Sequence, residues 1–202
     1  MLPSLRCLGL VTLTLLASCK SFDPKLLNPT SQTVSSKLPA MENRVQSEAT
    51  VIVGNGGAVV ASGSRDVATF FEREVQEVLT EPYGTKRGYL ELKVTTTKQR
   101  VGLGWAMLSG FTFCVPNLFG MPFATPQVSV TTQLDVLNGQ RQLLATYRAD
   151  AEAKSVTSIY SSTSYADPAR VLYLQAVRQC LDQIKLKMSP DAERLRGQLT
   201  GI

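Results

Sequence analysis

An alternating pattern between residues 126 and 154 constrains the fold of this chain more than any other feature. Apolar and polar residues alternate over 128–136, which is typical of a strand with one face on a core. The Asn138-Gly139 dipeptide follows, and it favours a tight type I′ turn. The alternation resumes over 143–151, so the sequence predicts a β-hairpin. The residues predicted to face the core are Val128, Val130, Thr132, Leu134, Val136, Leu143, Ala145, Tyr147, Ala149 and Ala151.

Four other segments complete the predicted domain. Residues 88–100 alternate like the hairpin and predict a further strand, and residues 49–64 predict two short strands. Residues 65–82 and 168–188 carry apolar residues at helical spacing and predict two long helices. Together these segments predict an α+β domain, in which an antiparallel sheet of about four strands has two long helices on one face.

Charged residues on the two predicted helices are expected to face water. Glu72, Glu74 and Glu77 lie close together on the first helix, and a solvated face explains them better than an acidic cluster that binds metal. On the second helix, Lys185 and Lys187 are likewise expected to lie outside the apolar face.

The segment from Gly104 to Phe123 carries no charged residue. With residues 101–103 it is long enough in principle to span a bilayer, but a single crossing would separate two strands that are predicted to pair. Burial against the core as a connector and exposure as a loop that contacts a membrane or a partner both remain open. The residues whose exposure decides between these alternatives, and which form the candidate contact surface, are Trp105, Phe111, Phe113, Leu118 and Phe119.

Composition narrows the function classes. The chain has 202 residues with 21 basic and 16 acidic side chains and no basic run interleaved with aromatics, so we do not expect nucleic-acid binding. Because there is no histidine, Ser-His-Asp and Cys-His catalysis is impossible and the commonest transition-metal ligand is missing. Asp135 and Asp150 lie near strand ends, but their spacing does not place them across a cleft, as paired-carboxylate hydrolysis requires. We therefore expect a protein that is not an enzyme and uses no metal or cofactor.

The N-terminus has the layout of a secretory signal peptide, because Arg6 precedes an uncharged run that ends in small residues. The motif Leu16-Ala17-Ser18-Cys19 resembles the lipobox of bacterial lipoproteins. This resemblance implies cleavage before Cys19 and acyl chains on that residue, which would anchor the chain in a membrane. No aspartate follows Cys19 directly, and this favours the outer membrane of a bacterial envelope, with the domain facing the periplasm.

These signals divide the chain into four predicted parts: a signal peptide (1–18), a lipidated N-terminus and tether (19–48), the α+β domain (49–188) and a C-terminal tail with a short helix (189–202). The tether is rich in small and polar residues, and 25 such residues would span about 28 Å as a flexible coil. The alternative is that Leu26 and Leu27 pack back on the domain.

Two cysteines other than Cys19 lie in the part that would be exported. An exported protein sits in a compartment that permits disulfides, so a bridge between Cys114 and Cys180 is open. Both residues lie among apolar neighbours, and two buried thiols are the alternative.

The order helix, strand, hairpin, helix is similar to the small α/β domains of several periplasm-facing lipoproteins. These include the family that resembles the N-terminal domain of the translocation protein TolB, and the activators of cell-wall synthases. The stretches "FEREVQEVLTEPYG" and "GWAMLSGFTFCVPNLFGMPF" resemble those of uncharacterised envelope lipoproteins from the Bacteroidetes. The resemblances imply a place in a bacterial envelope and no particular activity.

Two function classes follow. The first is a non-enzymatic, lipid-anchored envelope protein that acts through protein–protein interaction or assembly at the membrane, with a sheet edge or the uncharged segment as its contact. The second is a carrier or sensor of an apolar or cell-wall ligand, bound in a pocket between the sheet and the helices. The sequence leaves the oligomeric state open.

Overall fold

A computed structural model of the chain describes residues 23–47, 51–54, 57–60, 62–100, 102, 104–112, 115–156, 158 and 168–201. Within these residues the main sheet has four strands in the order β1-β4-β5-β6. The strands are β1 (Glu42–Ser47), β4 (Gly88–Arg100), β5 (Gln127–Asn138) and β6 (Leu143–Lys154). Strands β4, β5 and β6 are antiparallel, and β1 pairs with β4 in parallel.

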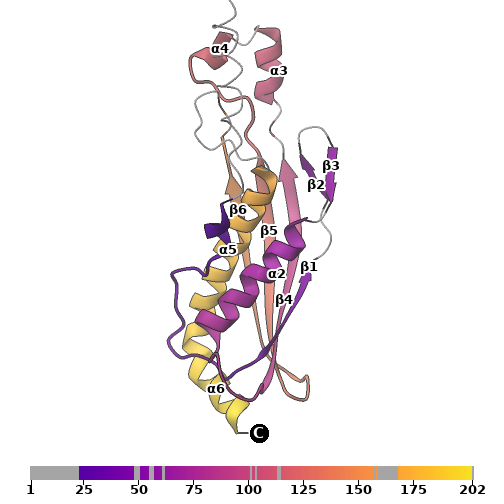
Figure 1. Ribbon diagram of the computed structural model, residues 1–202. Coiled ribbons are helices and arrows are strands. Elements are labelled where there is room, and N and C mark those ends of the chain that lie inside the picture. The colour runs from indigo at the N-terminus through magenta and orange to yellow at the C-terminus, as the bar shows by residue number, and fades with distance from the viewer. Residues whose placement is uncertain are drawn as a thin grey trace, which may run out of the picture.

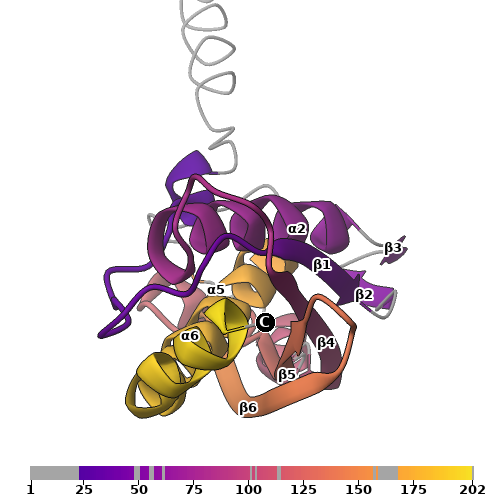
Figure 2. The ribbon, with the colours of Figure 1, turned by 90° about the horizontal axis from the view of Figure 1, so that it is seen from below.

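Two long helices cover one face of this sheet. They are α2 (Ser62–Glu74), which continues into the π-helical turn η3 (Val75–Leu79), and α5 (Pro168–Met188). Helix α5 packs over β5 and β6, and α2 lies against β1 and α5. Figures 1 and 2 show both helices on the same side of the sheet. The predicted α+β architecture is confirmed.

A separate hairpin consists of β2 (Val51–Gly54) and β3 (Gly57–Val60), which are antiparallel. The two short strands predicted in this part of the sequence are therefore present. Figure 1 shows the hairpin beside the main sheet.

The core lies between the main sheet and the two helices. Leu92 of β4 is paired with Leu134 of β5, which is in turn paired with Tyr147 of β6, and all three side chains are buried. From the helices, Phe70 and Leu181 belong to the same cluster. Apolar residues recur at every second position on the strands and at every third or fourth on the helices, so each element has one apolar face to bury.

The turn between β5 and β6 differs from the type I′ turn predicted at Asn138-Gly139. That turn requires positive φ at both central residues, whereas Arg141 is the non-glycine residue with positive φ, at 61°. The side-chain carbonyl of Asn138 accepts hydrogen bonds from the N–H groups of Gln140 and Gln142, each at 2.9 Å. Asn138 thus stabilises a longer loop by satisfying its backbone donors.

Residues 24–47 belong to the packed domain, so the predicted flexible tether is wrong for this stretch. The short helix η2 (Pro24–Leu27) contacts α2 and α5, and Leu27 packs against the core, as the alternative proposed. Leu38 is fully buried, and its N–H donates to the carbonyl of Leu79 at 2.9 Å. The apolar residues here follow no helical or strand period because they fill gaps at the margin of the core, and pattern reading therefore missed them.

The C-terminal residues are also part of the domain rather than a tail. After the turn η4 (Ser189–Asp191), helix α6 (Ala192–Thr200) continues from α5. Ala192, Leu195 and Leu199 are buried in the same core cluster. The short helix predicted here is present, and its apolar stripe explains why it packs.

Candidate functional site

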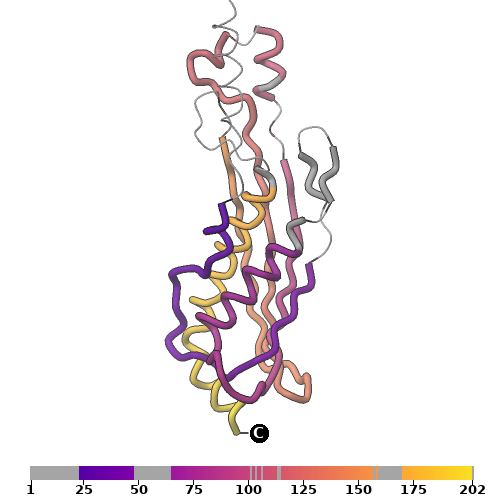
Figure 3. Tube along the Cα trace, in the orientation of Figure 1, coloured from indigo at the N-terminus to yellow at the C-terminus, as the bar shows by residue number. Residues whose placement is uncertain are grey.

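The uncharged segment forms a projection beyond one end of the sheet, here called the tip (residues 104–112 and 115–123). It contains helix α3 (Gly104–Phe111) and helix α4 (Val115–Leu118). Figures 1 and 3 show the tip past the ends of β4 and β5, at the opposite end of the molecule from α6. In the described part of the chain, no helix has both the length and the apolar character to span a membrane.

The chain enters and leaves the tip through a narrow neck. Gly102 has φ of 64°, and a Cβ at this position would lie 2.5 Å from the carbonyl oxygen of Thr125. Only glycine combines this backbone conformation with such a close approach. Both ends of the tip are therefore held together next to the strands that position it.

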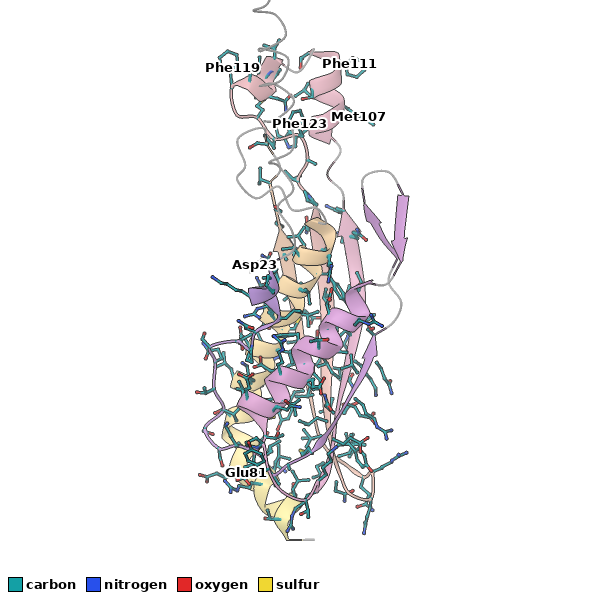
Figure 4. All side chains as sticks on the ribbon, in the orientation of Figure 1. Asp23, Glu81, Met107, Phe111, Phe119 and Phe123 are labelled. Carbon is teal, nitrogen blue, oxygen red and sulfur yellow. The ribbon has the colours of Figure 1, made fainter. Side chains whose placement is uncertain are left out.

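Of the five predicted contact residues, four are exposed. Phe111 and Phe119 are each 87% exposed, Leu118 is 62% exposed and Trp105 is 40% exposed, while Phe113 lies outside the described residues. Figure 4 shows Phe111 and Phe119 on opposite sides of the tip. These exposures contradict the alternative of burial against the core. The tip also exposes the apolar side chains of Met107, Leu108, Val115 and Met121.

Two polar side chains of the tip, in contrast, turn inward. Ser109 and Asn117 are buried, and the Ser109 hydroxyl donates to the side-chain carbonyl of Asn117. The Asn117 amide donates to the carbonyl of Met121 at 3.2 Å, and the Thr112 hydroxyl donates to the carbonyl of Leu108 at 2.8 Å. The tip is therefore polar inside and apolar outside, the reverse of a water-soluble helix pair.

Charged residues gather at the base of the tip, where the strands end. Arg100 of β4, Gln127 of β5 and Lys154 of β6 are in register, and Lys98 and Glu152 lie two residue pairs further from the tip. Lys154 pairs with Glu152 at 2.7 Å. The hydrogen bond from Lys154, together with the nearby charge of Lys98, lowers the pKa of Glu152. The base therefore has three basic residues and one acidic residue, a net positive charge.

The predicted lipid attachment residue and one predicted disulfide residue lie outside the described part of the chain. These are Cys19 and Cys114. Cys180 is a free, fully buried thiol on α5, with Sγ 3.5 Å from the carbonyl oxygen of Val130 and 3.6 Å from that of Ala149. Burial raises the pKa of this thiol. Cys180 thus matches the buried-thiol alternative for this residue.

A buried ion pair lies where both charged residues were expected to face water. Lys185 is 1% exposed and Glu74 is fully buried, and the Lys185 Nζ lies 2.6 Å from Glu74 Oε1. Lys185 also donates to the carbonyl of Gln32 at 2.7 Å, and the backbone N–H of Thr30 donates to Glu74 at 2.9 Å. The pair therefore fastens the N-terminal segment to α2 and α5. Expecting Glu74 and Lys185 to be solvated was wrong, because each falls on the apolar stripe of its helix.

A second ion pair joins the same two helices nearer the tip. Arg170 at the start of α5 donates two hydrogen bonds to the carboxylate of Asp66 on α2, at 2.5 and 2.7 Å. Asp66 is buried and Arg170 is partly buried. This two-point contact sets the angle between the helices more closely than a single bond could.

The sheet face opposite the helices is polar. Asp135 accepts hydrogen bonds from Lys93 and Gln133 at 2.9 Å and from Thr146 at 2.8 Å. Burial alone would raise the pKa of Asp135, but these three hydrogen bonds together lower it. Asp150 instead accepts from the Thr131 hydroxyl.

The structure does not bring the two carboxylates of Asp135 and Asp150 together. Asp150 is paired across the strands with Thr131, four positions from Asp135 on β5. Four residues of strand cover about 13 Å, which is beyond the separation used by paired-carboxylate hydrolases. Among the described residues, no group of three or more potential metal ligands comes together.

A shallow hollow of about 360 Å³ lies on this uncovered face. Thr97, Ser129, Thr131, Asp150 and Glu152 line it. The hollow lies on the side of the sheet that faces away from the helices. The predicted ligand pocket would have been on the other side, between the sheet and the helices. The space between sheet and helices is filled by the side chains of the core cluster.

No protein-family model matches this chain, and no curated protein matches it. Among solved structures, it is similar to a provisionally assigned neuraminyllactose-binding hemagglutinin homolog from Helicobacter pylori. The two share 10% sequence identity with a TM-score of 0.41, over 86% of this chain and 95% of that one. It is also similar to a provisionally assigned lipoprotein from Caulobacter crescentus CB15, with 9% identity and a TM-score of 0.28, over 78% of this chain and 92% of that one.

Proposed function

We propose that this chain is a non-enzymatic, lipid-anchored protein of the bacterial envelope that acts through protein–protein interaction or assembly at the membrane. Acyl chains on Cys19 anchor the protein in the outer membrane, and the domain faces the periplasm. The single observation that carries the proposal is the exposed apolar tip. Large apolar side chains gathered at one exposed end of a domain are typical of a part that another component of the cell, either a membrane or a protein, covers.

The rest of the domain supports contact rather than catalysis. Asp135 and Asp150 belong to separate hydrogen-bond groups. Cys180 is buried under the sheet, where a raised pKa keeps its thiol protonated and unreactive. Asp135 and Cys180 therefore serve the internal structure of the domain.

The uncovered sheet face is the surface best suited to a protein partner. It is broad, and its polar side chains can form hydrogen bonds across an interface. The β6 edge suits a partner less well, because α5 already occupies some of its carbonyls. Lys187 donates to the carbonyl of Arg148 at 2.6 Å, and Gln183 donates to that of Asp150 at 3.3 Å. Such bonds leave fewer groups for an added strand.

The alternative, a carrier or sensor of an apolar or cell-wall ligand, has less support. It needs room between the sheet and the helices, and core side chains fill that space. A polar glycan could still bind in the hollow of the uncovered face, where Thr97, Thr131 and Asp150 offer hydrogen-bonding groups.

Photo-cross-linking in intact cells tests the proposed interaction. The full-length protein would carry a photoreactive residue at Thr97, on the uncovered face, or at Tyr83, an exposed control site in the loop before β4. We expect one protein to be captured reproducibly from Thr97 and not from Tyr83. Capture of no protein from Thr97 or from the tip, together with glycan or lipid retained by the purified protein, would favour the alternative function.

Metabolic labelling with an alkyne-tagged fatty acid tests the anchor separately. We expect the full-length protein to take up the label and the Cys19→Ala variant to lose it. Equal labelling of both proteins would contradict anchoring at Cys19.

A further inference from the structure

We infer that the tip enters the lipid bilayer, and that this bilayer is the membrane that holds the acyl chains of Cys19. This inference rests on the proposed lipid anchor. It goes further by assigning lipid, and not protein, as the direct contact of the tip. The tip would then act as a second attachment that sets the orientation of the domain.

The outward face of the tip matches a lipid environment. Two short helices expose aromatic and aliphatic side chains in several directions, with Phe111 and Phe119 on opposite sides. A protein interface of ordinary composition has one face, with a polar rim and about one hydrogen bond per 100–200 Å². An apolar medium that surrounds the tip fits side chains on more than one side better than a single protein surface does.

The inward polar groups support the same conclusion. In hydrocarbon, a polar group without a hydrogen-bond partner is strongly unfavourable, so segments that enter lipid satisfy their polar groups internally. Ser109, Thr112 and Asn117 all do so, through Ser109–Asn117, Asn117–Met121 and Thr112–Leu108 hydrogen bonds.

The base of the tip has the charge expected at a membrane surface. Lys98 and Arg100 on β4 and Lys154 on β6 are exposed, and Glu152 is the acidic residue among them. Basic residues next to an inserted apolar segment are attracted to anionic headgroups near the membrane surface. With the tip in the acyl region, these side chains would lie at headgroup level.

The short link to the anchor favours the same membrane. Helix η2 is fixed to the domain, since Arg178 donates to the carbonyl of Leu26 at 2.8 Å and also to that of Asn28. In the sequence, Cys19 lies four residues before Asp23, and four residues of chain reach at most about 14 Å. Figure 4 shows Asp23 between the tip and Glu81, which lies toward the other end of the domain. The anchor thus keeps the tip side of the domain close to the bilayer it occupies.

The only tryptophan of the chain, Trp105, lies in the tip and reports on its surroundings. The full-length acylated protein would be reconstituted into vesicles of phosphatidylethanolamine and phosphatidylglycerol, with or without brominated acyl chains. We expect the brominated lipid to quench Trp105, its emission to shift to shorter wavelength, and acrylamide in the water to quench it poorly. Strong quenching by acrylamide and none by brominated lipid would overturn the inference.

A matched pair of variants distinguishes insertion from anchoring. Phe111→Glu/Phe119→Glu places two charges on exposed positions of the tip. Tyr83→Glu places one charge on the exposed loop before β4, outside the tip. Both proteins should still float with the vesicles, but only the tip variant should lose quenching by brominated lipid. If the unmodified protein fails to float, the anchor proposal fails. If it floats while Trp105 stays in water, only the tip inference fails.

A protein contact at the tip is the remaining outcome. A photoreactive residue at Phe119 in cells would then capture a protein reproducibly, while Trp105 in pure lipid vesicles would remain accessible to acrylamide. That pair of results would overturn lipid insertion. Capture of phospholipid at Phe119 would support it.

Discussion

Helix α5 and the tip differ in the exposure of their apolar side chains. On α5, Leu172, Val177, Leu181 and Ile184 are buried against the sheet, and its charged residues mostly point elsewhere. In the tip, Phe111 and its apolar neighbours are exposed and the polar residues are inside. An amphipathic helix can bury one face because a sheet lies beneath it. The tip extends beyond the end of the sheet, so its apolar side chains have no sheet face to pack against.

The largest expected effect comes from replacing one phenylalanine in each of the two regions. Phe70→Ala removes a fully buried ring and should lower the free energy of unfolding by about 3–5 kcal/mol. Phe111→Ala should change it by less than about 0.5 kcal/mol, because the ring is exposed in water. Urea denaturation in detergent-free buffer measures both. A large loss from Phe111→Ala would mean that the tip packs on the domain.

The buried ion pair tests whether polar contacts contribute as much stability as apolar ones to the body of the domain, which is the sheet and the helices without the tip. Glu74→Ala leaves the buried Lys185 ammonium with Asp182, 3.2 Å away, as its remaining acidic partner, and should cost about 3 kcal/mol of stability. Leu186→Ala on the same helix is the control, since that side chain is exposed and should have little effect. Replacing both charged residues, as Glu74→Leu/Lys185→Met, should recover much of the loss. No recovery would show that the contacts to Thr30 and Gln32 matter more than the charges.

A smaller effect is expected from the polar interior of the tip. Asn117→Ala removes the partner of the Ser109 hydroxyl and the bond to the Met121 carbonyl, which should cost about 1–3 kcal/mol locally. We expect faster amide exchange and proteolysis within the tip and unchanged denaturation of the body. Thr97→Ala is an exposed control on the sheet. If Asn117→Ala destabilises the whole domain, the tip and the body unfold as one unit.

The smallest effect at ordinary pH comes from two tyrosines of the body. Burial raises the pKa of Tyr147, which also donates to Asp191, and the pKa of Tyr173, in each case to about 12. A raised folded-state pKa means that the folded protein holds the proton more tightly. Stability should therefore be complete below pH 10 and fall between about pH 10 and 12.

Phenolate absorbance and denaturation, measured together against pH, check this expectation. Tyr147→Phe should reduce the alkaline loss, because one of the two protons no longer titrates. A pH profile unchanged by that substitution would place the whole effect on Tyr173 or on other groups.

Much of the body could be predicted because its elements are strongly periodic. The alternation in β4 and β5 placed Leu92 and Leu134 on the buried face, and the helical spacing placed Val67 and Phe71 there. The strand β1 was missed because Glu42–Ser47 is mostly polar and short, and it becomes a strand by pairing with β4. The type I′ turn was also wrong, because the Asn138 side chain stabilises a longer loop.

The buried pair left a signal in the sequence that was misread. Glu74 follows Phe70 and Phe71 at helical spacing and precedes Val78, so it lies on the buried stripe of α2. Lys185 occupies the same kind of position after Leu181. Two opposite charges on two apolar stripes could have suggested a pair. Their contact with Thr30 and Gln32 could not have been predicted, because those residues belong to a segment with no periodic pattern.

By itself, the sequence determined which residues could face a core and that residues 104–123 would carry no charge. Periodicity and composition are local properties, so they can be read without knowing what lies nearby. The tertiary structure alone decided that the tip is exposed and that Glu74 meets Lys185. These outcomes depend on which surfaces remain once the sheet and helices have packed: the tip extends past the end of the sheet, and the two apolar stripes meet where α2 packs against α5.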